Sequence, residues 1–167
     1  VNKIDRMIVT PWEVSGRIDY EKLIKDFGTS HITKGLLERI EKAAGETHFM
    51  LDRKVFFSHR DLDWLLDKYE KGEEFVLYTG RGPSGDTHLG HLLPWVFTKW
   101  LQDKFDAELY FQITDDEKFV VREDMDLSET TRLGYDNALD IIALGFDPDK
   151  TFIFVDTDYI KSLYKIA

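Results

Sequence analysis

The apolar residues of the first 72 positions recur every three or four residues, the spacing that places them on one face of a helix. Asp19 precedes the first run as an N-cap, and Ser58 with Asp61 makes a partial capping box for the last. A glycine ends each run. We expect three helices whose apolar stripes form core, at residues 20–27, 36–44 and 58–71. Residues 9–14 are expected to be extended or turning, because the residue before a proline avoids the helical region.

The period changes after residue 74. Short runs of β-branched and aromatic residues predict buried strands at residues 75–79, 109–113 and 152–155. Helical spacing returns between them, first up to Phe105 and then from Asp126, which forms a capping box with Glu129, to Gly145. Strands that alternate with helices in this order predict a parallel sheet joined by right-handed crossovers.

The expected fold class is therefore α/β, the first half of a doubly wound, Rossmann-like nucleotide-binding domain. A mostly helical N-terminal extension precedes it. The boundary is predicted to separate an appended region, residues 1–72, from a βαβαβ portion, residues 73–167.

Composition limits the classes of function. The 167 residues are 43% hydrophobic and 14% aromatic, enough for a packed core, and no apolar run approaches the length of a membrane span. The net charge of -10 argues against a broad phosphate-binding face, although a few local bases and backbone amides can still hold a nucleotide. The absence of cysteine excludes disulfides and cysteine-based zinc sites. The first residues lack the features of a secretory signal, so a cytoplasmic protein without membrane association is expected.

A glycine-rich loop follows the first predicted strand of the sheet. Gly80–Gly85 matches G-x-G-x-x-G, and Asp106 and Glu108 lie at the distance of a ribose-binding acid, so this loop alone suggests a dinucleotide site. Two prolines oppose that interpretation: Pro83 removes an amide that would face phosphate, and Pro94 argues against a helix that begins at the third glycine. The loop lacks the lysine of a Walker sequence.

The sequence His88-Leu89-Gly90-His91 puts two imidazoles three residues apart at a helix start, just beyond the carboxyl end of a strand. Ligands bind at that edge of open parallel sheets. Imidazoles beside helix-terminal amides can bind the phosphates of ATP while a carboxylate displaces pyrophosphate, and Gly90 leaves room for a ribose or a base. The alternatives are a metal pair or simple helix caps. No third ligand accompanies the pair, and the adjacent carboxylates of Asp115–Glu117 point in different directions, so no metal site is expected.

Several stretches in order resemble the tryptophanyl-tRNA synthetases of the archaeal and eukaryotic type, which are class I aminoacyl-tRNA synthetases. They are Leu77–Ser84, the HIGH-like sequence His88–His91, Phe97–Asp103 and Gln112–Lys118, with further similarity at Asp5-Arg6, Pro11-Trp12, Phe27-Gly28, Phe56–Asp61 and Asp147–Asp158. The one visible departure is Leu89, where the family commonly has isoleucine or valine. An apolar side chain suffices there.

The resemblance implies a role for individual residues. Tyr78 and Gln112 would read the indole N–H of tryptophan, a lone donor that must meet acceptors when buried. Glu117 would lie near the substrate ammonium. Without the resemblance, a packed aromatic and an outward polar residue are the simpler interpretations of the first two. Trp12 is a candidate to close over adenine. The remaining implied roles are catalysis by His88 and His91, and ATP binding by Arg81, Gly82, Gly90 and Lys118.

The function that the resemblance implies is tryptophan–tRNA ligation: tryptophan attacks ATP, which arrives with Mg²⁺, and the adenylate then esterifies tRNA. The 73–167 portion would be the start of the class I catalytic domain of a homodimeric enzyme. The chain would be an N-terminal fragment, inactive alone, without the K-M-S-K-S-type loop and the anticodon domain that binds most of the tRNA. Three alternatives remain: a tyrosyl-type synthetase, a nicotinamide-dependent oxidoreductase that uses the glycine loop, and a non-catalytic interaction module.

Overall fold

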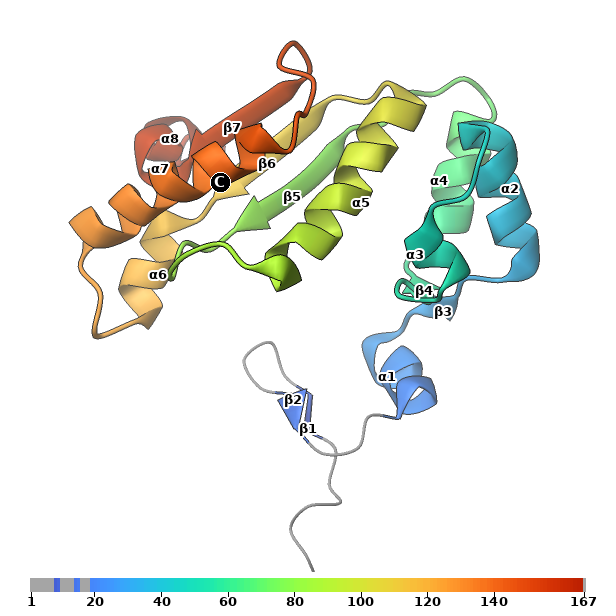
Figure 1. Cartoon of the computed structure of the whole chain (residues 1–167), viewed down its shortest axis with the longest axis horizontal. Helices are drawn as coiled ribbons and strands as arrows, with labels where there is room; N and C mark the ends of the chain where they lie inside the picture. Colours follow the sequence, from blue (N-terminus) through green and yellow to red (C-terminus); the bar gives the residue numbers. More distant parts are fainter. Residues whose placement is uncertain (1–7, 10–13, 16–18, 167) are drawn as a thin grey trace, which may run out of the picture.

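The structure, a computed structural model, describes residues 8–9, 14–15 and 19–166 (Figure 1). Its elements follow one another along the chain as β1 (Ile8–Val9), β2 (Val14–Ser15), α1 (Tyr20–Phe27), β3 (Ser30–His31), α2 (Lys34–Ala44), α3 (Phe49–Asp52), β4 (Ser58–His59), α4 (Leu62–Tyr69), β5 (Leu77–Arg81), α5 (Leu89–Phe105), β6 (Leu109–Ile113), α6 (Asp115–Val121), α7 (Leu127–Ala143), β7 (Thr151–Val155) and α8 (Asp156–Leu163).

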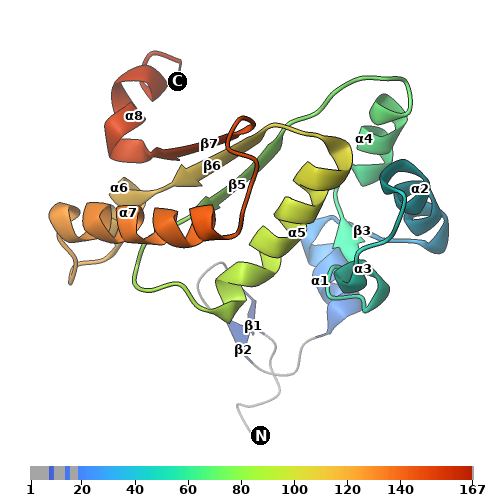
Figure 2. The ribbon, with the colours of Figure 1, turned by 45° about the horizontal axis from the view of Figure 1, so that its top comes forward.

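A parallel sheet in the order β5-β6-β7 forms the centre of the fold, which confirms the predicted α/β class. Side chains alternate along β6, where Leu109, Phe111 and Ile113 are fully buried. They pack against Trp95 of α5 and Ile141 of α7. Both helices therefore cover the same face of the sheet, as Figure 2 shows.

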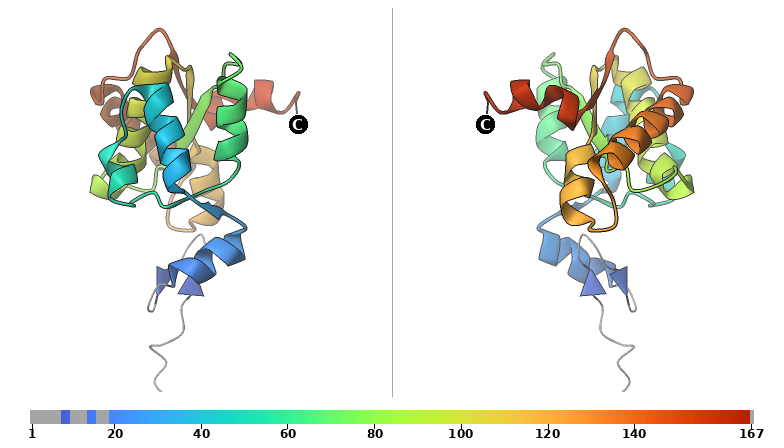
Figure 3. Two further views of the ribbon diagram at one scale, coloured as in Figure 1. Left: turned by 90° about the vertical axis from the view of Figure 1, so that its right-hand side faces the viewer. Right: turned by 90° about the vertical axis from the view of Figure 1, so that its left-hand side faces the viewer.

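The opposite face of the sheet is open. Tyr78, Tyr110 and Phe152 are paired side by side across the three strands, and they are 66%, 36% and 48% exposed. The rings of Tyr110 and Phe152 stack with their centroids 5.1 Å apart. On this side α8 leaves the end of β7, away from α5 and α7 (Figure 3), and its Tyr159 contacts Phe154.

The caps of three helices agree with the sequence. Asp19 accepts the amide of Lys22 at the start of α1, and Gly28 ends that helix with a left-handed φ of 59°. Asp126 accepts the amide of Glu129 and starts α7. Helix α2 ends at Gly45, which also has a positive φ. Local hydrogen bonds thus fix these boundaries, from side chain to backbone at the two aspartates and within the backbone at the two glycines.

The predicted start of the third helix is wrong. Ser58 and His59 form β4, which pairs antiparallel with Ser30 and His31 of β3. Asp61 has a left-handed φ of 59° and makes no capping bond with its side chain. The Nδ1 atom of His59 accepts the amide of Leu62 instead, so α4 begins four residues later than expected.

The first strand of the sheet is also displaced from its prediction. It runs to Arg81, two residues further than expected, and leaves Phe75 and Val76 outside it. Gly80 therefore belongs to the strand, where a Cβ atom would come within 2.9 Å of the carbonyl oxygen of Gln112.

The short helices α3, α6 and α8 were not predicted. Among the described residues, no helix combines the length and the apolar character needed to cross a membrane.

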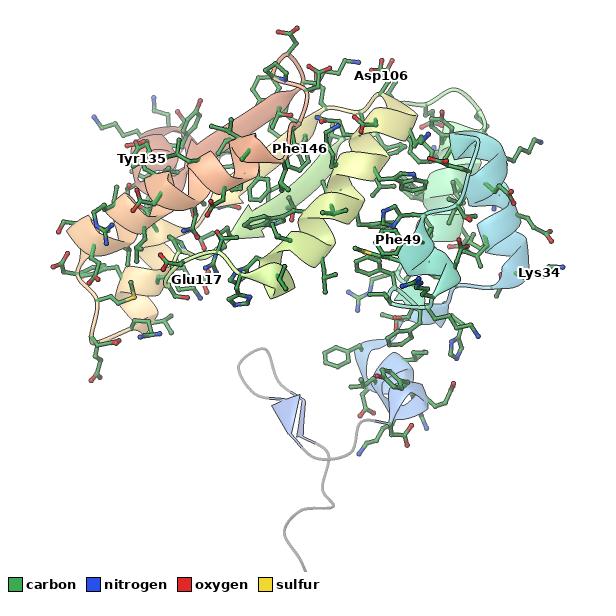
Figure 4. All side chains as sticks on the ribbon, in the orientation of Figure 1. Lys34, Phe49, Asp106, Glu117, Tyr135 and Phe146 are labelled. Carbon is green, nitrogen blue, oxygen red and sulfur yellow. The ribbon has the colours of Figure 1, made fainter. Side chains whose placement is uncertain are left out.

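A second apolar cluster joins α2, α3 and α4 to the outer side of α5. Its buried residues are Leu36, Ile40, Leu51 and Leu66. His48 is buried beside it, its ring 5.3 Å from the ring of Trp100, and its Nδ1 accepts the amide of Met50. Figure 4 shows Phe49 on the side of α3 that faces α5 and Phe146 between α7 and α5.

Lowering the pH is expected to destabilise the fold through His48. Burial lowers the pKa of His48 below 6.5, against the raising effect of the charges of Asp52 and Glu46. The unfolded chain then binds more protons, so the stability present above pH 6.5 is lost as the pH falls through the lowered pKa of the folded state. Urea unfolding between about pH 7.5 and pH 5.5 measures the loss. The variant His48→Gln should show a weaker pH dependence, and an unchanged dependence would contradict the assignment.

Candidate active site

The three parallel strands end at one edge of the sheet and gather there the residues that follow them. Arg81, Ile113 and Val155 are paired in register, and the amide of Thr114 donates to the carbonyl oxygen of Arg81. The glycine loop, α6 and α8 therefore start from neighbouring points. Helix α5 also begins at this edge (Figure 2), so the edge has the arrangement of a ligand site in an open α/β sheet.

The side chains of His88 and His91 cap the start of α5. His88 is the N-cap residue, and its Nδ1 accepts the amide of Gly90 at 3.1 Å. The Nδ1 of His91 accepts the amide of His88 at 3.2 Å. The centroids of the two rings are 3.8 Å apart and their planes are tilted by 31°, and a Cβ atom on Gly90 would meet the His88 ring at 3.0 Å. The glycine is needed for this close approach.

These bonds determine which ring nitrogen carries the proton in each neutral imidazole. A ring nitrogen that accepts an amide proton carries no proton itself, so each neutral imidazole holds its proton on Nε2. Burial lowers the pKa of His91, and the charges of Arg81 and His88 lower it further. Within the described part of the chain neither Nε2 has a hydrogen-bond partner. The helix start therefore presents two side-chain N–H donors at the positive end of the helix, a combination suited to phosphate oxygens.

Lys118 crosses from α6 to the glycine loop. A Cβ atom on Gly82 would lie 2.2 Å from its Cε and 3.0 Å from its Nζ, so a larger residue at position 82 would displace the end of the lysine side chain. The ammonium is 3.7 Å from the carboxylate of Glu117, which also accepts the hydroxyl of Thr114. Lys118 and Gly82, predicted separately as phosphate contacts, are thus brought together.

Arg81 holds the glycine loop instead of facing outward. Its guanidinium donates to the carbonyl oxygens of Gly82 and Gly85 and, through Nε, to Oδ1 of Asn137 at 2.8 Å. The side-chain amide nitrogen of Asn137, a buried residue of α7, also donates to the carbonyl oxygen of Gly85. Burial lowers the pKa of Arg81. With three of its bonds directed at protein oxygens, Arg81 positions the loop, a role that the sequence did not suggest.

The glycine loop does not form the turn of a dinucleotide site. That turn requires a helix which begins at the third glycine, and α5 begins four residues after Gly85. Gly80 lies inside β5. The dinucleotide interpretation is therefore not supported by the geometry, as Pro94 had indicated.

Tyr78 and Gln112 meet on the open face of the sheet. The hydroxyl of Tyr78 donates to Oε1 of Gln112, and the amide nitrogen of Gln112 donates to both carboxylate oxygens of Asp156, at 2.7 and 2.9 Å. Burial raises the pKa of Asp156; the bond from Gln112 opposes this, and neighbouring Asp116 and Asp115 raise it further. The Tyr78 and Gln112 oxygens together form an acceptor pair.

The acidic stretch after β6 has separate roles. Asp115 is fully buried and accepts the hydroxyls of Thr131 and Thr157 at 2.7 Å and the amide of Thr157 at 3.1 Å. It ties α6 to α7 and to the start of α8. Glu117 is exposed on α6, at the edge of the fold in Figure 4. In residues 8–9, 14–15 and 19–166 no group of three or more His, Cys, Asp or Glu is arranged to hold a metal ion.

Sequence reasoning missed three residues of this site: Asp115, Asn137 and Asp156. The position of Asp156 directly after a predicted strand was a signal that it would reach the common edge. Asn137 lies within a helix and gave no such signal. The predicted adenine contact, Trp12, lies outside the described residues.

Comparison with known proteins identifies the family of the chain. A family model described as tRNA synthetases class I (W and Y) matches residues 70–166. The tryptophan–tRNA ligase of Saccharolobus solfataricus is 59% identical over 163 residues, which cover 98% of this chain and 43% of that protein. The ligase of Pyrococcus horikoshii is 55% identical over 165 residues, with 98% and 42% covered. The chain thus spans less than half the length of the curated relatives it matches.

Solved structures show the same fold. Tryptophanyl-tRNA synthetase from Trypanosoma brucei has a TM-score of 0.82 and 54% identity over 88% of this chain and 45% of that one. The enzyme from Plasmodium falciparum has a TM-score of 0.85 and 47% identity over 89% and 41%. These similarities confirm the resemblance seen in the sequence. With the family model matching more than half of its residues, the chain belongs to the class I tRNA synthetases of the W and Y group.

Proposed function

We propose that this chain carries the tryptophan-activating half-site of a tryptophan–tRNA ligase. The observations that carry the proposal are the pair of Nε2–H donors of His88 and His91 at the carboxyl edge of the sheet and the two acceptor oxygens that Tyr78 and Gln112 offer on its open face. Tryptophan carboxylate attacks the α-phosphate of ATP and pyrophosphate leaves. A tRNA hydroxyl then attacks the carbonyl of the adenylate, which forms the tryptophanyl ester and releases AMP. The names of the relatives, all tryptophan–tRNA ligases, support tryptophan over tyrosine.

The histidines act on ATP in this proposal. Negative charge moves onto the phosphate oxygens as pyrophosphate leaves, and donors already in place stabilise that charge without reorganisation. Gly90 gives the nucleotide access to the start of the helix. Lys118, held over Gly82, supplies a positive charge for phosphate, and Arg81 contributes by fixing the loop. Mg²⁺ is proposed to enter with ATP as its phosphate-bound counterion.

Tryptophan is proposed to lie with its indole N–H between Tyr78 and Gln112, and with its ammonium toward Glu117. The ring nitrogen is a donor only, so the two acceptor oxygens on the open face of the sheet match it. The exposed carboxylate of Glu117 suits a cation.

Replacing Gln112 with alanine is expected to raise the KM for tryptophan by about 10- to 100-fold and to leave kcat little changed, because a buried N–H loses its acceptor. Discrimination against an analogue that lacks the ring N–H should relax. Steady-state pyrophosphate exchange with both amino acids measures this. Tyr110→Phe, which removes a hydroxyl bonded to Glu108 on the same strand, is the control. Equal kinetics for the two amino acids in wild type and Gln112→Ala would refute the pocket.

The remaining features of the proposal concern the protein as a whole. Residues 1–72 are proposed to be an appended region and residues 73–167 the first portion of the catalytic domain, in a cytoplasmic homodimer that binds tRNA mainly outside these residues.

Tryptophan-dependent exchange of labelled pyrophosphate into ATP tests the activity, with the 167-residue chain and the full-length protein assayed in parallel. Tyrosine-dependent exchange would favour the tyrosyl alternative. Stabilisation by NAD instead of ATP in a thermal-shift assay would favour an oxidoreductase, and binding of neither would favour an interaction module.

A further inference from the structure

The amide of Gln112 has two chemically different ends, and they face different partners. Its nitrogen donates to both oxygens of Asp156, and its oxygen accepts the hydroxyl of Tyr78. The torsion that interchanges these ends is soft and nearly two-fold. Something other than the glutamine itself must therefore select the orientation.

Asp156 makes that selection by its chemistry. Both oxygens of the Asp156 carboxyl group accept from the amide nitrogen of Gln112, and a carboxyl group that accepts at both oxygens presents no donor to the amide oxygen. The oxygen end must then point toward Tyr78. Reversal would place the amide oxygen against the carboxylate and leave two acceptors in contact. The assignment therefore follows from the identity of residue 156.

The position of Asp156 is itself held firmly. It is the first residue of α8 and only 6% exposed. The next residue, Thr157, donates both its amide and its hydroxyl to the buried carboxylate of Asp115. Thr131 of α7 donates to the same carboxylate. Helices α6, α7 and α8 thus fix the point from which Asp156 reaches Gln112.

We propose that Asp156 is a positioning residue that sets specificity for the indole N–H, because it keeps the carbonyl oxygen of Gln112 turned toward the amino-acid pocket. This inference rests on the proposed function. Nothing in the proposed contacts of tryptophan requires Asp156 to touch the substrate; its effect passes through the Gln112 amide.

The test is Asp156→Asn, which keeps the shape of the side chain and adds a donor. Asparagine can face either end of the Gln112 amide, so the reversed orientation becomes populated and presents an NH₂ group to the ring N–H. In the full-length protein the KM for tryptophan should rise about tenfold, with kcat within about twofold. The KM for the isostere with sulfur in place of the ring N–H should stay within about twofold, because that ring has no proton to accept.

Asp158→Asn is the matched control, since Asp158 lies on the same helix and accepts a tyrosine hydroxyl, that of Tyr135. It should change neither KM. Equal increases for tryptophan and the isostere in Asp156→Asn would overturn the positioning role and indicate general damage to the pocket. An unchanged KM for both would overturn it as well.

The orientation can also be measured without substrate. In wild-type protein the NMR signals of the Gln112 side-chain NH₂ should show slow exchange with water, because both carboxylate oxygens accept from it, and Asp156→Asn should weaken this protection. Protection that is unchanged in the variant overturns the inference. Wild-type protein that is protected but activates no tryptophan would sink the proposed function alone, so the two failures are distinguishable.

Discussion

Replacing His91 with alanine is expected to slow adenylate formation by about 10²- to 10³-fold, or roughly 2 to 4 kcal/mol of transition-state stabilisation. The variant loses the Nε2–H donor that faces the proposed phosphate site. It also loses the acceptor of the His88 amide, so the position of the first ring is weakened. Tryptophan binding should be little changed, because the indole contacts lie on the strands. Tryptophan-dependent pyrophosphate exchange measures the rate, and equilibrium titration measures the binding.

His59→Ala separates the loss of chemistry from the loss of a cap. The His59 ring accepts the amide of Leu62 at 3.1 Å at the start of α4, the same kind of bond in another part of the fold. Both variants should lose a similar, small amount of stability, and only His91→Ala should lose adenylation. A normal exchange rate in His91→Ala would rule out the proposed role of the histidine.

Replacing Asp115 with alanine is expected to lower the free energy of unfolding by about 2 to 4 kcal/mol. The change removes the acceptor of three hydrogen bonds and leaves the hydroxyls of Thr131 and Thr157 and one amide without a partner in a buried place. Relief of repulsion with the neighbouring carboxylates offsets part of this cost. Urea unfolding monitored by circular dichroism measures the difference.

Asp140→Ala is the control for that experiment, because Asp140 is exposed on α7 and its loss should cost less than about 0.5 kcal/mol. Asp115→Asn should fall between the two, since its amide oxygen can still accept from Thr157. Equal stability of Asp115→Ala and Asp140→Ala would show that the buried carboxylate does not hold the three helices together.

The elements predicted well are those fixed by local interactions. Apolar spacing located α1 and α2, with Asp19 and Gly28 as caps of the first and Gly45 as the stop of the second, and a short run of strand-forming residues located β6 at Leu109–Ile113. The wrong start of α4 has a non-local cause, since β4 exists only because Ser30 and His31 pair with it. No pattern within residues 58–61 contains that information.

The residues of the site also divide into those that the local sequence predicts and those whose roles depend on distant contacts. His88 and His91 could be predicted because their spacing and the helix start are local, whereas the roles of Arg81, Asn137 and Asp156 depend on contacts between segments 44 to 56 residues apart. The resemblance to a family identified Gln112. It did not indicate which residue orients the amide, since that depends on the register of three strands.

The backbone bonds of the two imidazoles have a consequence for the timing of catalysis. Both rings are immobilised when the chain folds, because each Nδ1 is tied to an amide of the first helical turn. The entropy of ordering these donors is thus lost once, during folding, and not again in each catalytic cycle. We therefore expect the histidine pair to act as a rigid surface onto which the triphosphate docks.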